Sequence, residues 1–488
     1  MTESASQDNS GIDALSPERF FSSGPEADGS LLRWAALRSY FDHLAERTAL
    51  VRSAEIGFDW SGLPLQLVVI SSARNMARLE EIRDIQRRLS DPRGIATVAE
   101  RDRLIADAPC VVAITCSIHA TEVGGSQGAP WFAHDLISTS PELLDDVVIL
   151  LVPCLNPGGL ELVVDWRERW RGKSHEGVPP PELYHPFCGH DNNRDWVMQS
   201  QPEIRAVVEH VHRRWSPHIV VDLHELVPNG PRYVVPPYIE PVDPNVPALL
   251  EAGAATLGSH IAAALLLAGK TGVVSGALFD AYSPMRAYPF HHGGVRVLAE
   301  AAGTRLGSPA TISWESLAAA PEFDPHLRGP RHLAPWPGGR WTLRDVIDHQ
   351  RIAVAAVAEH ASRFRARWVR TAWHARAETC ARAEPAAYVL LPYIWQRDPG
   401  AALELADLLR TGDLEVSASL DAFEVNGVEF PPGSLLLLHG QPNWGYAVTL
   451  LGAEDYPMRR RSPSGPVQTP YDVTGHNLPL LMGVDVVA

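Results

Sequence analysis

Four short apolar segments, each ending abruptly in polar residues, constrain the fold of this chain more than any other feature. They are CVVAITCSIHATE at 110–122, DVVILLVPCLNP at 146–157, PHIVVDLHE at 217–225 and GVRVLAEAAG at 294–303. Runs of Val, Ile and Leu of this length predict strands that are buried on both faces. Helical patterns separate them, so we predict an α/β fold with a mixed, largely parallel central sheet flanked by helices. In such sheets ligands bind at the carboxyl ends of the strands.

The length of 488 residues predicts more than one domain, because single cores usually stop growing at about 250–300 residues. Residues 1–30 are rich in Ser, Asp, Glu and Gly and predict a flexible N-terminal tail. We expect a catalytic domain over 31–376 and, after an Arg- and Ala-rich helical stretch, a small C-terminal α/β accessory module over 377–488.

Composition excludes several classes of function. The formal net charge of -16 argues against a nucleic-acid partner, since such proteins carry a basic surface. Five scattered cysteines without a C-x-x-C pair predict reduced, mostly buried thiols. The polar N-terminus has no secretory signal, and no apolar run is long enough to span a bilayer, so a cytoplasmic protein without membrane contact is expected. The sequence does not reveal the oligomeric state.

A metal-ligand pattern stands at the ends of two predicted strands. His119 and Glu122 form H-x-x-E, and His224 follows 105 positions later. Two histidines and one carboxylate leave one position of a tetrahedral zinc ion open, as in catalytic sites. Taken alone, H-x-x-E is also typical of a solvated loop pair.

Further motifs, in matching order and spacing, make residues 15–365 resemble the M14 family of zinc metallocarboxypeptidases. They are HATE at 119–122, NPGG at 156–159, RWRGK at 169–173, DNNRDW at 191–196, DLHE at 222–225 and VLAEAAG at 297–303. The segment 386–488 is similar to the C-terminal extension of some bacterial members, with Gln441-Pro442 and Tyr471–Gly475 as matching elements.

The resemblance implies a hydrolase with one Zn²⁺ ion held by His119, Glu122 and His224. Glu300 would take a proton from the metal-bound water and pass it to the leaving amine. Its alternative is a buried, paired structural carboxylate. Arg171 would stabilise the oxyanion, although a run containing several arginines is also typical of a solvated helix face.

The resemblance further assigns Asn193 and Arg194 to the free carboxylate of the substrate, for which a guanidinium is well shaped. Asp191 would orient a ligand histidine, or else simply form a turn. Tyr282 is the proposed substrate-capping tyrosine, with Tyr288 as the other candidate. Three histidines of a Pro- and His-rich loop are expected to be exposed, namely His175, His185 and His190.

Departures from the usual family pattern are Gly158 in the NPGG turn, Asp195 in DNNRDW and Glu225 after the second histidine. They predict a branch remote from the digestive carboxypeptidases. The preference of those enzymes for hydrophobic or basic substrate side chains is therefore not carried over to this chain. The expected activity is cleavage of a C-terminal amide bond in a peptide or aminoacyl conjugate. The alternatives are an amidohydrolase of a small N-acyl amino acid and a catalytically silent binding protein, which would have lost a ligand or the base.

Overall fold

An eight-stranded sheet forms the centre of the computed structural model, which describes residues 14–22, 30–320, 322–390, 392, 395–453, 456–460, 462–468, 470–471 and 475–488. In spatial order its strands are β1 (Val51–Phe58), β2 (Pro64–Ile70), β4 (Val147–Val152), β3 (Cys110–Cys116), β5 (Ile219–Leu226), β8 (Val295–Ala302), β6 (Tyr233–Val235) and β7 (Val273–Ser275). The central strands β4, β3, β5 and β8 are mutually parallel. Antiparallel pairings join β1 to β2, β2 to β4 and β6 to β8. The predicted mixed, largely parallel sheet is confirmed.

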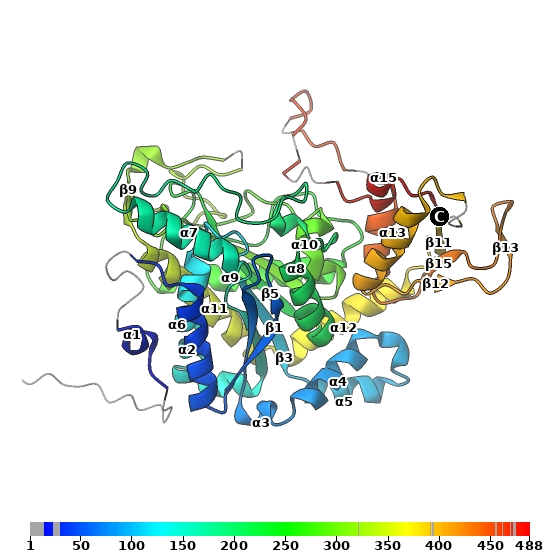
Figure 1. Ribbon diagram of the computed structural model, residues 1–488, viewed down its shortest axis with the longest axis horizontal. Helices are drawn as coiled ribbons and strands as arrows, with labels where there is room; N and C mark the ends of the chain where they lie inside the picture. Colours follow the sequence, from blue (N-terminus) through cyan, green and yellow to red (C-terminus); the bar gives the residue numbers. More distant parts are fainter. Residues whose placement is uncertain are drawn as a thin grey trace, which may run out of the picture.

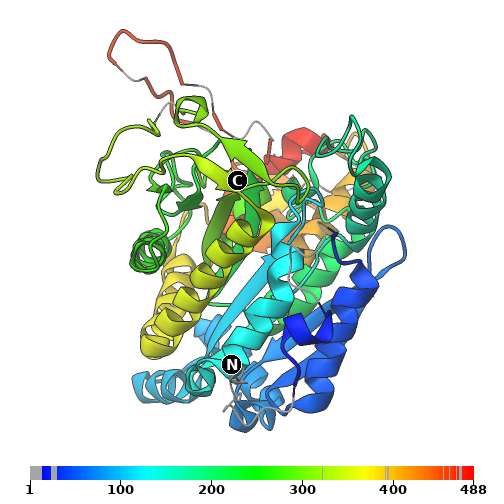
Figure 2. The same ribbon diagram turned by 90° about the vertical axis from the view of Figure 1, so that its left-hand side faces the viewer.

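Helices cover both faces of the sheet, because the side chains of each central strand alternate between two apolar clusters. In β3, Val112 and Ile114 belong to one cluster, while Val111 and Ala113 belong to the other. The first cluster packs under α2 (Trp34–Arg47), α6 (Gly124–Ser138), α7 (Pro157–Trp170), α9 (Ala248–Leu267) and α11 (Leu343–Arg363). The second packs under α4 (Leu79–Ser90), α8 (Pro202–Val207) and α10 (Pro284–His291). Figure 2 shows the blue, cyan and yellow-green helices of the first layer side by side.

The C-terminal part forms a second, four-stranded sheet beside the main one (Figure 1). It consists of β12 (Ser417–Ala418), β15 (Leu435–Leu438), β11 (Ala387–Leu390) and β16 (Val486–Val487), with α13 (Pro399–Thr411), α14 (Trp444–Leu451) and α15 (Leu478–Met482). Its buried residues join the cluster that covers the α8 and α10 face of the main sheet. The predicted boundary at Arg376 falls inside α12 (Arg365–Ala381), and the division into domains stays a prediction.

Much of the predicted N-terminal tail lies outside the described residues. Within 14–22, helix α1 (Pro17–Phe20) is formed, and Phe20 and Phe21 pack against the main core. No apolar run long enough to span a bilayer is expected from the sequence, but helix α9 meets that criterion by length and composition alone. Core helices pass the same test, and α9 packs against α11 and β8.

Candidate metal centre

The turn between β3 and α6 places His119 and Glu122 at the carboxyl end of the sheet. The backbone N–H of Glu122 donates to the His119 carbonyl, which closes the turn. The Ser117 hydroxyl donates to the Glu122 carbonyl and accepts from the N–H of Ser126 in α6. Helix α6 begins at Gly124, where a Cβ would lie 2.5 Å from Val346 and 2.9 Å from a Glu225 oxygen. The turn therefore requires glycine at this point.

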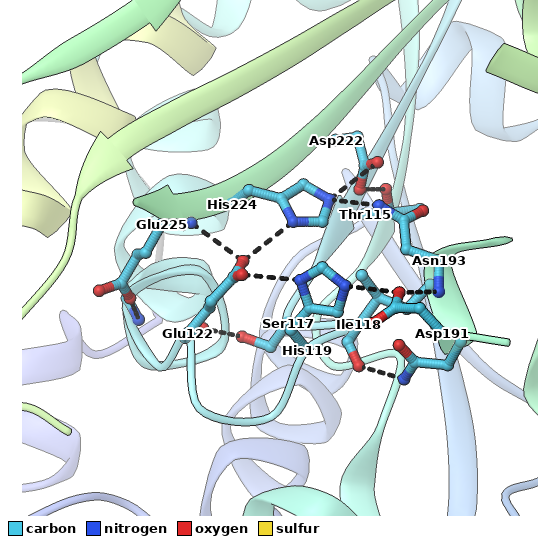
Figure 3. Close-up of polar contacts among 12 residues, drawn as sticks. Thr115, Ser117, Ile118, His119, Glu122, Asp191, Asn193, Asp222, His224 and Glu225 are labelled. Carbon is cyan, nitrogen blue, oxygen red and sulfur yellow. Dashed lines mark hydrogen bonds and ion pairs between the residues drawn. The ribbon is translucent and has the colours of Figure 1, made fainter. Parts of the chain in front are cut away.

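His224 joins this pair from β5, the strand next to β3. Its Nδ1 lies 2.9 Å from Glu122 Oε2, and His119 Nδ1 lies 2.7 Å from Glu122 Oε1 (Figure 3). One ligand atom from each of the three side chains lies within 4.8 Å of the other two. The structure thus brings together the three residues that the sequence predicts as ligands.

Each histidine is fixed by a second carboxylate at its other ring nitrogen. His119 Nε2 lies 2.9 Å from Asp191 Oδ1, and His224 Nε2 lies 3.0 Å from Asp222 Oδ2 (Figure 3). Asp222 also accepts from Arg296, at 2.6 Å, and from the Thr115 hydroxyl, at 2.9 Å. A carboxylate that accepts Nε2–H leaves the Nδ1 lone pair directed at the cluster, as in metal sites.

Asp222 was not singled out by sequence reasoning. The signal was present in the DLHE motif, because residues two apart on a strand point to the same face. Burial alone would raise the pKa of the Asp222 carboxyl, but the charges of His224 and Arg296 hold it well below its usual range. Asp222 is therefore an ionised partner of His224.

The donor set fits a zinc ion. Two imidazole nitrogens and a carboxylate are ligands that zinc takes in catalytic sites. Glu122, Asp191, Asp222 and Arg296 together carry two net negative charges, which match a dication. Burial lowers the pKa of His224, but Asp222 and Glu122 raise it overall to about 10. This electrostatic field favours a cation at the centre of the cluster.

Glu300 lies beside the cluster on β8. It is the register partner of His224 in the parallel β5–β8 ladder, so the two side chains lie on the same face of the sheet. Burial, with the charge of Glu122 adding to it, raises the pKa of Glu300 to about 7, although the charge of His224 opposes the shift. A carboxyl with this pKa can both accept and return a proton near neutral pH.

The loop after α7 brings a third segment to the centre. Residues Asn192–Arg194 form a 3-10 turn that Asp191 caps by accepting from the N–H of Asn193. Asn193 Nδ2 lies 3.2 Å from His224 Nε2, and its Oδ1 accepts from Trp196 Nε1. Arg194 is half-buried, and its charge helps to lower the pKa of Asp191, which burial alone would raise. Asn193 therefore lies against a candidate ligand histidine, and its predicted contact with substrate stays a prediction.

Part of this chain matches a known protein family. Residues 37–227 match the zinc carboxypeptidase family. The match contains all three candidate ligands and confirms the predicted resemblance over these residues. Glu300 and the C-terminal part lie beyond it.

Solved metallocarboxypeptidase structures are similar at low identity. The metallo-carboxypeptidase from Burkholderia cenocepacia is 13% identical, with a TM-score of 0.40, over 67% of this chain and 68% of that one. Bovine thrombin-activatable fibrinolysis inhibitor, in complex with tick carboxypeptidase inhibitor, is 15% identical, with a TM-score of 0.43, over 69% of this chain and 99% of that one. The metallo-carboxypeptidase from Pseudomonas aeruginosa is 12% identical, with a TM-score of 0.39, over 66% and 67%. No curated protein matches the chain.

Three other residues singled out from the sequence, Arg171, Tyr282 and Tyr288, lie outside the candidate metal cluster. Arg171 is exposed at the end of α7, and among the described residues no hydrogen bond or ion pair joins it to the cluster. Tyr282 is buried, with its ring centroid 4.8 Å from that of Tyr456. Tyr288 is fully buried and stacks on His292, so it faces the core rather than a substrate. The roles of Arg171 and Tyr282 stay predictions.

A cavity of about 670 Å³ opens beside the metal centre. Its lining includes Thr121, Glu122 and Glu225 from the ligand segments and Gly177 from the loop that follows Arg171. Gly303 and Arg305 line it from the segment after β8. The cavity has the size of a site for a drug-sized ligand or a short peptide.

The histidine-rich loop differs from its prediction. His175 is exposed as expected, but His185 is buried and the side chain of His190 is only 16% exposed. His190 Nε2 contacts Asp195 Oδ1 at 2.7 Å. The prediction that these two histidines are exposed is wrong, because the loop folds back on itself through side-chain contacts that composition does not reveal.

Proposed function

We propose that the protein is a zinc-dependent hydrolase that cleaves the amide bond next to a free C-terminal carboxylate in a peptide or an aminoacyl conjugate. The observation that carries this proposal is the register pair His224–Glu300, which sets a buried carboxyl of raised pKa beside a two-histidine, one-carboxylate donor set. The match of residues 37–227 to zinc carboxypeptidases supports the same reaction class.

His119, Glu122 and His224 would hold the ion through Nδ1, the carboxylate and Nδ1, with Asp191 and Asp222 fixing the two imidazoles. Zinc, when bound, supplies a Lewis acid that polarises the scissile carbonyl and acidifies water. Glu300 accepts the proton of the attacking water and delivers it to the leaving nitrogen. Burial of Glu300 favours this double role, since it moves its pKa toward neutrality.

Arg194 is the group proposed to bind the substrate carboxylate. It stands on the turn that contacts both ligand histidines, through Asp191 to His119 and through Asn193 to His224. A guanidinium that pairs with a carboxylate at this place would position the terminal amide bond near the ion. The substrate is then an acid, and its amide derivative is a poor substrate.

The test is an assay of N-acylated dipeptides and N-acyl amino acids, each as free acid and as C-terminal amide. The zinc-loaded protein is expected to cleave the free acids and to lose activity after removal of the metal. In Arg194→Met the preference for free acid over amide is expected to fall at least tenfold, while Arg205→Met, an exposed arginine of α8, leaves it unchanged. Equal cleavage of acids and amides by the wild type would contradict the proposal, and cleavage of N-acyl amino acids alone would favour the amidohydrolase.

A further inference from the structure

A second group of metal-binding side chains lies outside the candidate catalytic cluster. One ligand atom each from Cys188, His190 and Asp195 lies within 4.8 Å of the other two. The Asp195 side chain is fully buried and that of His190 is 16% exposed. A thiol, an imidazole and a carboxylate are the three side-chain types that zinc binds in proteins.

The spacing of these atoms is compatible with one ion. Bond lengths of about 2.0–2.3 Å in a tetrahedral zinc site place ligand atoms about 3.3–3.8 Å apart. His190 Nε2 and Asp195 Oδ1 are 2.7 Å apart, the same separation as His119 Nδ1 and Glu122 Oε1 in the candidate catalytic cluster. Small rotations of the side chains would bring all three ligand atoms to bonding distance.

Hydrogen bonds fix the Asp195 carboxylate in one orientation. It accepts from the N–H and the hydroxyl of Ser200 and from the N–H of Gln201. Ligand carboxylates are fixed in this way by hydrogen bonds from their surroundings. Gln201 Nε2 also lies 3.1 Å from Cys188 Sγ and 3.4 Å from the Nδ1 atom of buried His185.

The segment around these residues has little regular structure. Residues 171–201 connect α7 to α8 and contain only the 3-10 turn Asn192–Arg194 as regular structure. Irregular loops of this length are uncommon in compact domains unless they are functional. This one supplies Asp191 to His119 and Asn193 to His224. Residues 188, 190 and 195 stand on either side of this turn.

We propose that Cys188, His190 and Asp195 bind a second, structural zinc ion that clips the 171–201 loop around its 3-10 turn. The ion joins the two ends of the stretch 191–194 and so fixes the segment that positions both ligand histidines. It does not depend on the proposed function, because none of its ligands belongs to the candidate catalytic cluster. The competing explanation is an ion pair between His190 and Asp195 with a packed, metal-free thiol beside it.

Cobalt(II) separates the two explanations, since a thiolate ligand gives cobalt an intense charge-transfer absorption in the near ultraviolet that nitrogen and oxygen ligands do not. The full-length protein is freed of metal and titrated with cobalt. The wild type is expected to bind two equivalents, one of them with the charge-transfer band. Cys188→Ser is expected to lose the band and one equivalent, whereas Cys380→Ser, which removes a similarly half-buried thiol of α12, keeps both.

The variant His119→Ala/His224→Ala provides the reciprocal control. This variant is expected to keep the charge-transfer band and to bind one equivalent of cobalt. Loss of binding at the candidate catalytic cluster is thereby distinguished from loss of binding at Cys188, His190 and Asp195. Cobalt binding by the wild type without a charge-transfer band overturns the proposal. This outcome does not depend on whether any of the variants folds. A band that persists in Cys188→Ser, or that disappears in Cys380→Ser, overturns the assignment as well.

Discussion

Glu300 and His224 face each other as register partners on the neighbouring parallel strands β8 and β5. The pairing fixes their separation through the backbone of the sheet rather than through flexible loops. The proposed proton acceptor and a candidate metal ligand are thereby held on one face of a rigid scaffold, which is the condition for a preorganised site.

Glu300→Gln is expected to lower kcat by about 10²–10⁴-fold, the usual contribution of a general base, while zinc affinity stays within a few-fold. The amide keeps the volume of the side chain and removes the proton acceptor. Glu203→Gln is the matched control, because Glu203 is also buried and burial also raises its pKa to about 7, yet it lies on α8. Steady-state kinetics with a parallel zinc determination checks the prediction. Wild-type turnover in Glu300→Gln would rule out its role as base.

Asp222→Asn is expected to weaken zinc binding by about 10–100-fold, because the neutral amide lacks the negative charge that makes His224 a stronger ligand. It also leaves the buried Arg296 unpaired, which should cost about 3–5 kcal/mol of stability. The double variant Asp222→Asn/Arg296→Met is expected to recover much of the stability but none of the zinc affinity. Chelator competition and urea denaturation measure the two quantities. Unchanged zinc affinity in both variants would show that Asp222 only neutralises Arg296.

The free energy of unfolding is expected to depend on pH because of the buried carboxyl group of Glu203. Burial raises its folded-state pKa to about 7, with the charges of Asp59 and Asp195 adding to the shift. Between about pH 4.5 and 7 the folded state therefore holds a proton that the unfolded state has released, so this group lowers stability as pH rises. The loss amounts to about 3 kcal/mol above pH 7.

Glu203→Gln removes this titration. Its free energy of unfolding, relative to the wild type, is expected to increase with pH across that window and to stay constant above it. Denaturant unfolding at pH 5, 6, 7 and 8 is the measurement. A difference that is independent of pH would contradict the buried, protonated state of Glu203.

Tyr288→Phe is expected to leave kcat/KM within twofold of the wild type and to raise stability by about 1 kcal/mol. The hydroxyl of Tyr288 is buried without a hydrogen-bond partner in the described part of the chain, so its removal relieves a desolvation cost. Tyr282→Phe is the comparison, since Tyr282 is the candidate for contact with substrate. A tenfold loss of kcat/KM in Tyr288→Phe alone would reverse the assignment of the two tyrosines.

The sequence was sufficient to predict the central strands and the three residues of the candidate metal cluster. Continuous apolar runs such as that of β3 have a plain physical cause, burial on both faces, and the polar residues that follow them mark the end of the sheet. His119, Glu122 and His224 were predicted from the H-x-x-E spacing, the predicted strand ends and the family resemblance, and the parallel pairing of β3 with β5 brings them together.

Features that depend on tertiary contacts were not predicted. Strands β6 and β7 span only three residues each, too few for a periodic pattern. The support of His224 by Asp222 required knowledge of the strand face, and the burial of His185 required the path of an irregular loop. Composition alone assigned that loop to the surface.

The most direct test of the metal centre is an anomalous difference map at the zinc absorption edge from crystals of the zinc-loaded protein. We expect a peak about 2.0–2.2 Å from His119 Nδ1, His224 Nδ1 and a Glu122 oxygen. A map with no peak among these three side chains, or a zinc ion bound through the Nε2 atoms, would contradict the account.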